Sequence, residues 1–307
     1  MFCRLSSATG KCMKINAYIC AADPAWVESS VLSYYPHIDQ LVVSYDEDGR
    51  SWSGPQLDTS EVIQRLKQID TQSKIRWLPG HYSRVENYSN PMLNDTFQRQ
   101  DSLNVASEGA DWVLQIDSDE VVPNWGQLSR SLTAASAARS QCLYYPSIGV
   151  YQFVSRRKVL EACGRFGKRQ CYYSGPIAVR PFSHLTLSRR IEGTSYVTSC
   201  LGTVECGLPS DSVAVSSVMP IDAIWHLSHC RSLKAYQTKL ATWSHSADYG
   251  VANEAKFWIL ANRYPILAAM LSHIRRKSFI KGLRVLDLPC EVAELLKLNT
   301  SAGELID

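Results

Sequence analysis

Three carboxylates fall within four residues at Asp117-Ser118-Asp119-Glu120, directly after the apolar run 112–116 (WVLQI). Carboxylates this close repel one another unless a cation or a donor-rich ligand lies among them. Mg²⁺ and Mn²⁺ prefer oxygen ligands and bridge to phosphates, so the motif favours a nucleotide diphosphate with a divalent metal. A solvated acidic turn is the alternative interpretation.

Further charged residues follow neighbouring apolar runs. Asp46 and Asp48 come after the run QLVVSY, and Arg84 and Arg99 follow the next one. Together they predict a nucleotide cleft, with a carboxylate for the base or ribose and a guanidinium for phosphate. A simple ion pair between Arg99 and Asp95 on one helix surface is the alternative.

The apolar runs must lie on strands that alternate with helices. Charged loops then gather at one sheet edge, where ligands of open α/β sheets bind. The periodicity predicts strands over 14–22, 40–45, 74–78 and 112–116, and helices over 25–35, 60–69 and 91–108. This order predicts an α/β fold with a mostly parallel, Rossmann-like sheet flanked by helices.

After residue 122 the pattern changes to short β-rich segments, and it becomes helical again from Ser232. We therefore expect one domain over residues 14–245, divided into a half 14–125 and a half 126–245. A small helical extension is expected over 246–307.

The 307 residues are 45% hydrophobic, enough for a globular core, and the net charge of +3 implies no strongly charged partner. Ten cysteines without a C-x-x-C pair argue against a zinc knuckle or a redox pair. The N-terminus has no apolar run of signal-peptide length, and no run reaches about 18 apolar residues. These features predict a cytoplasmic protein.

The motif order resembles a known enzyme family. A strand followed by Ala21-Ala22-Asp23, a strand ending in SYDEDG, a helix running from Arg99 to Ala106, and WVLQIDSDE resemble the nucleotide-sugar half of family 2 glycosyltransferases with the GT-A fold. Gln100 replaces the usual asparagine of that family. The Asp-Ser-Asp-Glu motif is similar to the branch that includes lipopolysaccharide-core glucosyltransferases.

A second stretch, 225–232 followed by Lys239, extends the resemblance. It implies that His226 joins Asp119 in holding Mn²⁺ or Mg²⁺, and that Arg231 and Lys239 face the diphosphate. His229 stands where the family usually has tyrosine. A buried histidine and an exposed helix with ordinary charges are the alternative.

The resemblance also implies donor-binding roles for residues of the first half. Asp117 is expected to bind ribose or a water on the metal, and Asp46 or Asp48 the base. The remaining predicted donor-binding residues are Ala21, Asp23, Arg84 and Arg99.

Transfer with inversion requires a general base that deprotonates the acceptor hydroxyl. The family has an acidic residue in the acceptor half, and Asp211 stands near the corresponding offset, with Glu205 and Asp222 as competitors. A surface-loop aspartate is the alternative for Asp211.

Two basic regions bear on the acceptor. The segment 256–284 joins an apolar stretch to a basic cluster, which suits peripheral contact with the inner face of a membrane, or else core packing followed by a solvated helix end. Arginines and lysines between Arg156 and Arg190, interleaved with aromatics, would suit an anionic or even nucleic-acid acceptor. Structural cations beside sugar-stacking aromatics fit equally well.

The expected activity is metal-dependent transfer of a sugar from a nucleotide-diphosphate sugar, with UDP as the expected nucleotide, to a hydroxyl of a glycan, a lipid-linked glycan or another acceptor. One alternative is a sugar-phosphate nucleotidyltransferase, although 21–24 (AADP) is not the glycine-rich loop of that class. The other is a non-catalytic carbohydrate- or partner-binding module. The motifs fix no oligomeric state.

Overall fold

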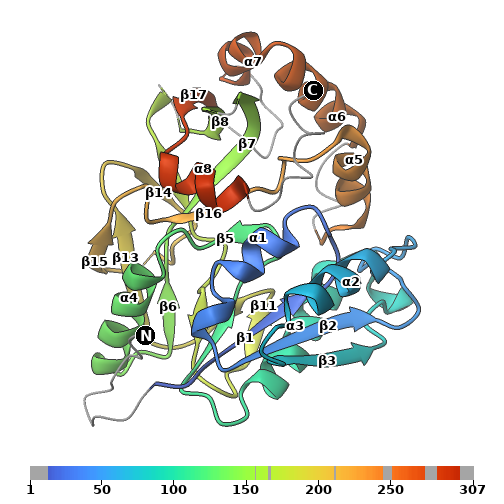
Figure 1. Cartoon of the computed structure of the whole chain (residues 1–307), viewed down its shortest axis with the longest axis vertical. Helices are drawn as coiled ribbons and strands as arrows, with labels where there is room; N and C mark the ends of the chain where they lie inside the picture. The colour runs from blue at the N-terminus through green and yellow to red at the C-terminus, as the bar shows by residue number, and fades with distance from the viewer. Residues whose placement is uncertain are drawn as a thin grey trace.

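The computed structural model describes residues 13–155, 157–164, 167–210, 212–244, 251–273 and 282–297. The fold is α/β, with mixed sheets flanked by helices (Figure 1). Within the described ranges, no helix has the length and apolarity that a transmembrane span requires.

The central sheet has eight strands in the order β15-β13-β6-β10-β4-β1-β2-β3. β10 runs antiparallel to β4 and β6, and all other neighbours are parallel. The α/β prediction is confirmed, but the sheet is mixed because β10 lies between two parallel groups. The strands are β1 (Ile15–Cys20), β2 (Gln40–Asp46), β3 (Ile75–Gly80), β4 (Trp112–Gln115), β6 (Cys142–Tyr144), β10 (Ala178–Val179), β13 (Ser195–Cys200) and β15 (Ala214–Val218).

Helices cover both faces of this sheet, so all six residues of β1 are buried. Alternate side chains of a strand face opposite sides. Ile15 and Ile19 pack with α1, α2 and α4, whereas Tyr18 packs with α3 and β11. These elements are α1 (Val27–Leu32), α2 (Ser60–Ile69), α3 (Met92–Ala106), α4 (Trp125–Ala137), and the hairpin β11 (Leu185–Leu187) and β12 (Arg190–Ile191).

A second mixed sheet has the strand order β14-β9-β7-β16-β5, and β8 and β17 continue it from β7. The short strand β5 begins at the end of the acidic motif and pairs with β16, so Glu120 lies opposite His226. This register brings two distant motifs together. The strands are β5 (Glu120–Val121), β7 (Ser147–Ser155), β8 (Lys158–Ala162), β9 (Gln170–Tyr172), β14 (Val204–Cys206), β16 (Ile224–His226) and β17 (Leu283–Asp287).

The C-terminal part combines helices with one strand. Its helices are α5 (Leu233–Thr242), α6 (Val251–Arg263), α7 (Pro265–Ser272) and α8 (Cys290–Lys297). The stretch 246–307 was expected to be helical, but β17 within it pairs antiparallel with β8. This pairing joins the C-terminal part to the second sheet. The boundary at residue 245 remains a prediction.

Candidate functional site

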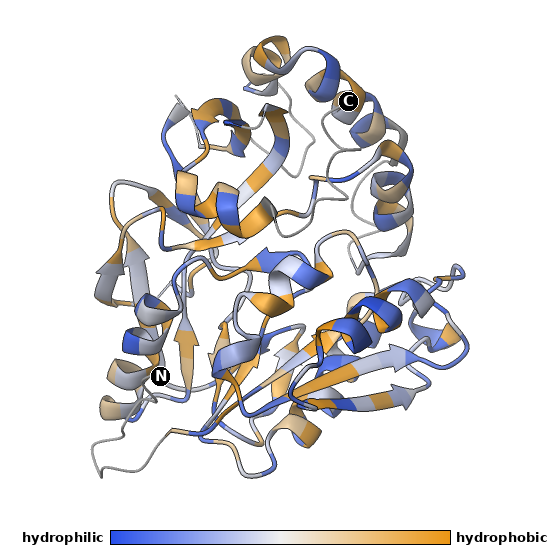
Figure 2. Cartoon of the chain, viewed as in Figure 1, coloured by the Kyte–Doolittle hydropathy of each residue, from blue (hydrophilic) through white to orange (hydrophobic). Residues whose placement is uncertain are grey.

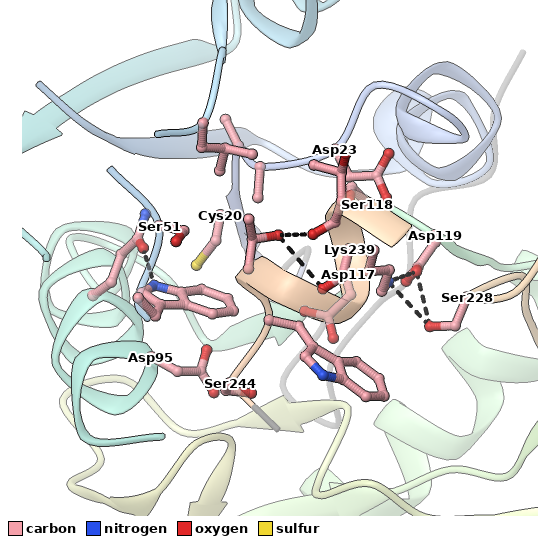
Figure 3. A pocket seen from close by; sticks show the side chains of 18 of the residues that line it. Cys20, Asp23, Ser51, Asp95, Asp117, Ser118, Asp119, Ser228, Lys239 and Ser244 are labelled. Carbon is pink, nitrogen blue, oxygen red and sulfur yellow. Dashed lines mark hydrogen bonds and ion pairs between the residues drawn. The ribbon is translucent and has the colours of Figure 1, made fainter. Parts of the chain in front are cut away.

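A cavity of about 660 Å³ lies at the carboxyl ends of β1, β2 and β4, with α5 on its other side (Figure 3). Its size falls in the range of small-molecule sites. Parallel strands end at the same edge of a sheet, so the loops that follow β1, β2 and β4 meet there. The edge predicted from the sequence is therefore where the cavity lies.

The three carboxylates of the acidic motif have different partners and therefore different roles. Glu120 faces away from the cavity and accepts two hydrogen bonds from Arg189, at 2.7 and 2.8 Å. It also accepts the backbone N–H of Asp117 at 3.0 Å, and Arg189 donates to the carbonyl oxygen of Gln115 at 2.7 Å. Glu120 and Arg189 are 1–3% exposed, and their pairing stabilises the turn of the acidic motif; of the two, only Arg189 lines the cavity.

Asp119 is buried and surrounded by donors. Its Oδ2 accepts hydrogen bonds from Ser228 Oγ at 3.0 Å, from Arg231 Nη2 at 3.1 Å and from Lys239 Nζ. Its Oδ1 lies 3.4 Å from His226 Nε2. Burial alone would raise the pKa of Asp119, but the Lys239 ammonium and His226 hold it well below its usual range. Figure 3 shows Asp119 bonded to Lys239 and Ser228.

Arg231 links the loop after β1 to the loop after β4. The guanidinium is 1% exposed and pairs with Asp23 as well as with Asp119. The resemblance assigned Arg231 and Lys239 to the diphosphate. In the structure both cations form ion pairs with Asp119. Burial lowers the pKa of Lys239, and the Asp119 carboxylate opposes that shift.

Asp117 lines the cavity beside Arg99, whose Nη2 is 2.9 Å from Asp117 Oδ1. Arg99 Nε also donates to Asp95 at 2.6 Å, so the pairing with Asp95 exists, but it is buried rather than on the helix surface. Burial by itself would raise the pKa of Asp117, but Arg99 and Arg189 lower it to about 2. Asp117 therefore stays ionised near neutral pH.

The site's ion-pair network contains five carboxylates and four Arg or Lys cations, and so carries one net negative charge when His226 is neutral. A diphosphate would add negative charge to a buried, near-neutral network. Such a ligand is favoured only when a further cation accompanies it. The carboxylates are Asp23, Asp95, Asp117, Asp119 and Glu120, and the cations are Arg99, Arg189, Arg231 and Lys239.

Asp119 and His226 can supply ligands to a divalent ion once His226 Nε2 gives up its 2.9 Å contact with Ser228 Oγ. Asp119 Oδ1 accepts none of the hydrogen bonds that occupy Oδ2, and its 3.4 Å separation from His226 Nε2 is close to the ~3 Å expected for adjacent ligands of one ion. Burial disfavours the charged imidazole, but Asp119 raises the pKa of His226 above its usual value. Among the described residues, no three His, Cys, Asp or Glu side chains form a metal site, so ligand oxygens would have to complete the coordination.

The predicted base-binding aspartates occupy unlike positions. Asp46 lines the cavity, but its carboxylate accepts backbone N–H groups at 2.7–3.1 Å. It thereby holds together the loops after β2 and β3. Asp48 is exposed near His81 and does not line the cavity. The donors to Asp46 are the N–H groups of Asp48, Arg50, Tyr82 and Ser83.

The other predicted donor-binding residues also differ in position. Ala21 and Asp23 line the cavity in the loop after β1. Arg84 does not line it: its guanidinium lies 3.5 Å from the centroid of the Phe97 ring. The structure therefore assembles Ala21, Asp23 and Arg99 at the cavity and leaves Arg84 outside it.

Trp52 is a cavity residue that sequence reasoning missed. It lies in the loop after β2, and its indole Nε1 donates to Gln98 Oε1 at 2.6 Å. The next residue, Ser53, donates to the carbonyl oxygen of Ala241 at 2.8 Å, which joins this loop to the end of α5. A tryptophan in the polar loop SWSG, just after the acidic residues, was the available signal.

In the described part of the chain, no Asp or Glu beyond Asp119 lines the cavity. Glu205 instead accepts hydrogen bonds from the Tyr173 hydroxyl and the Cys200 N–H, and Asp222 accepts from Asn124. Asp211 lies outside the described residues.

Three arginines of the basic stretch 156–190 make structural contacts. Arg169 pairs bidentately with the buried Glu161, at 2.6 and 2.9 Å. Arg180 lies 4.0 Å from the centroid of the Trp112 ring, and Arg189 is the buried partner of Glu120. These contacts favour structural cations over a face for an anionic acceptor. Arg156 and Arg165 lie outside the described residues.

Comparison with protein-family models and with curated proteins finds no match to this chain. The resemblance to family 2 glycosyltransferases therefore stays a prediction based on motifs.

Proposed function

We propose that the chain is a glycosyltransferase of the GT-A type that transfers a sugar from a nucleotide-diphosphate sugar to a hydroxyl acceptor. The observation that carries this proposal is the environment of Asp119. A buried carboxylate at the end of a parallel strand meets a histidine and two cations that lie over 100 residues further along the chain. This arrangement suits a diphosphate with a divalent ion.

Each charged group would serve a separate part of the donor. Arg231 and Lys239 would neutralise the charge that develops on the leaving diphosphate. Asp117, held ionised by Arg99, would accept hydrogen bonds from the ribose hydroxyls. Asp119 and His226 would hold Mn²⁺ or Mg²⁺, which when bound polarises the phosphate oxygens as a Lewis acid.

The acceptor hydroxyl would approach from the side of the cavity formed by the loop before β12 and by α5. Ser174, Ser188 and Arg190 line that side. Inversion remains part of the proposal, with Asp211 as the candidate base. Sugar activation by a nucleotidyltransferase is the second enzyme class, but the loop after β1 lacks the glycines that such enzymes use against phosphates.

A thermal-shift titration tests donor binding. UDP-, GDP- and TDP-sugars are added with and without Mn²⁺, because a ligand that binds only the native state raises the melting temperature. We expect a shift of several degrees with one nucleotide class, larger with Mn²⁺, because 100-fold saturation stabilises by about 2.7 kcal/mol. Absence of any shift contradicts the proposal.

A matched pair of variants then tests the site itself. Asp119→Asn keeps the side-chain shape and removes the charge, whereas Lys234→Met removes an exposed cation at the rim of the same cavity. We expect Asp119→Asn to abolish the Mn²⁺-dependent part of the shift and to lower donor hydrolysis about 10³-fold. Hydrolysis unchanged by Asp119→Asn would contradict the metal assignment, and binding without turnover in the wild type would favour a binding module.

A further inference from the structure

Helices α6 and α7 lie at one end of the molecule (Figure 1), and several of their large apolar residues are exposed. Figure 2 colours much of α7 in the hydrophobic range. Exposed residues of a surface helix are usually polar, so a cluster of apolar ones indicates an interaction site. The cluster, called here the α6–α7 face, comprises Ile259 (46% exposed), Tyr264 (50%), Ile266 (70%), Leu267 (44%) and Met270 (69%).

This face is separate from the core of the C-terminal part. The opposite sides of the two helices supply Phe257, Ala261 and Ala268, which pack with Tyr151 and Leu160 of the second sheet. The helices are therefore anchored through their inner residues. The outer residues are not needed for that packing.

The charges on the α6–α7 face are positive. Lys256 and Arg263 are exposed and flank Ile259 at helical spacing, three and four residues away. Between Asn253 and His273 the one acidic residue is Glu254, which is buried. The basic residues Arg275, Arg276 and Lys277 lie outside the described residues.

We infer that the α6–α7 face binds the surface of an anionic lipid bilayer. Apolar side chains flanked by lysine and arginine match a surface in which acyl chains lie beneath negative headgroups. A second copy of the chain fits less well, because a two-fold interface would place Lys256 and Arg263 against the same cations.

The site and this face lie on consecutive helices. α5 lines the cavity through Thr238 and Lys239 and packs against α6. A bilayer under α6 and α7 would therefore hold the cavity close to the lipid surface. This inference rests on the proposed function: a cavity near the lipid surface suits an acceptor that is itself anchored in the membrane.

Co-sedimentation with vesicles tests the inference with the full chain. Wild-type protein is mixed with vesicles of phosphatidylcholine alone and, separately, with vesicles that also contain about 30% phosphatidylglycerol. We expect binding to the anionic vesicles. Ile266→Asp with Met270→Asp should weaken binding at least tenfold, because each residue loses apolar burial and gains a repelled charge. The control is Val215→Asp with Met219→Asp, which changes two similarly exposed residues near the sheet edge at β15 and should leave binding intact.

Charge reversal separates the electrostatic part. Lys256→Glu with Arg263→Glu should weaken binding to anionic vesicles about 30-fold or more, because each basic residue contributes about fivefold. Failure of the wild type to bind anionic vesicles overturns the inference. So does a wild-type dimer in light scattering that Ile266→Asp with Met270→Asp dissociates, since the face then binds a second copy.

The nucleotide-sugar thermal shift, measured on the same variants, distinguishes the two proposals. An intact shift with lost vesicle binding supports the membrane face and shows that the variants are folded. Vesicle binding in a protein with no nucleotide response supports the face while contradicting the proposed function.

Discussion

The two halves of the chain contribute opposite charges to the cavity. Up to Asp119, the cavity is lined by seven carboxylates and by the cations Arg50 and Arg99. From Ser174 onward, its described lining residues include arginine, lysine and histidine but no carboxylate. Neither half therefore makes the charge-balanced cavity alone: the first half positions acidic groups, and the second supplies most of the cations that neutralise them.

The contacts that join the halves are long-range. Asp119 meets Lys239 across 120 residues, Arg231 across 112 and Ser228 across 109. Buried charges without partners are costly, so each half would be destabilised without the other. The same contacts therefore stabilise the fold and form the site, and variants that remove them test the comparison directly.

The largest effect is expected at the buried pair between Glu120 of the first half and Arg189 of the second. Arg189→Met leaves a buried carboxylate unpaired and should lower the free energy of unfolding by about 3–5 kcal/mol. Urea denaturation measures it. Arg190→Met, next in the chain but exposed, should cost less than about 0.5 kcal/mol.

A double variant shows whether the charge is the cause. Glu120→Gln with Arg189→Met removes both charges and should recover a large part of the lost stability. If Arg189→Met is as mild as Arg190→Met, the halves are not held together by this pair.

The second-largest effect concerns Lys239, which with Arg231 is one of the two cations that the second half pairs with Asp119. Lys239→Met should lower the rate of nucleoside diphosphate release about 10²-fold, because a preorganised charge facing the leaving group is lost. Lys234→Met, on the same helix at the rim of the cavity, should change the rate less than threefold. Equal losses of rate in the two variants would mean that the overall positive charge of α5 matters, rather than the position of Lys239 beside Asp119.

The first half of the fold was largely predictable because its elements are local. Apolar runs and helical periodicity predicted β1, β2, β3 and β4 and helices α2 and α3 to within a few residues. The acidic motif was recognisable because it ends a strand. The resemblance alone pointed to His226, Arg231 and Lys239, which the structure brings to Asp119.

The second half was harder to predict because its key contacts depend on strand pairing. The two residues of β10 are too few to show a period, so its antiparallel insertion between β4 and β6 has no sequence signal. Arg189 and Arg190 are identical neighbours, yet the turn before β12 buries the first and exposes the second. That choice is set by Glu120, which is 69 residues away.

Acid sensitivity should also differ between the halves. Asp117 has a pKa of about 2, so its contribution to stability is present above its unfolded value of 3.8 and is lost only below that pH. Burial, with the nearby Lys239 and His226 charges, lowers the pKa of His229 to about 3 from 6.5. Below pH 6.5 the unfolded chain binds a proton that native His229 does not, so stability falls as the pH falls.

Between pH 6.5 and 5, protonation of His229 in the unfolded chain lowers the free energy of unfolding by about 2 kcal/mol. Urea titrations at several pH values should show a steeper loss of stability in the wild type than in His229→Gln, because the raised pKa of His226 acts in the opposite direction in both proteins. A slope unaffected by His229→Gln would place the acid sensitivity elsewhere.

The smallest expected effect tests whether the first half alone holds the base of the nucleotide. Trp52 lines the cavity with its indole N–H bonded to Gln98 and the Arg99 guanidinium 6.0 Å from its ring centroid, and aromatic stacking on a base contributes about 1 kcal/mol or more. Trp52→Ala should therefore weaken binding of the free nucleoside diphosphate about fivefold in calorimetry, whereas Trp52→Phe should retain most of the affinity. Because stacking involves no phosphate charge, the loss should be the same in the Lys239→Met background. A loss of affinity that appears only when Lys239 is present would show that Trp52 acts through the contact of its loop with α5. Base binding would then depend on both halves rather than on the first half alone.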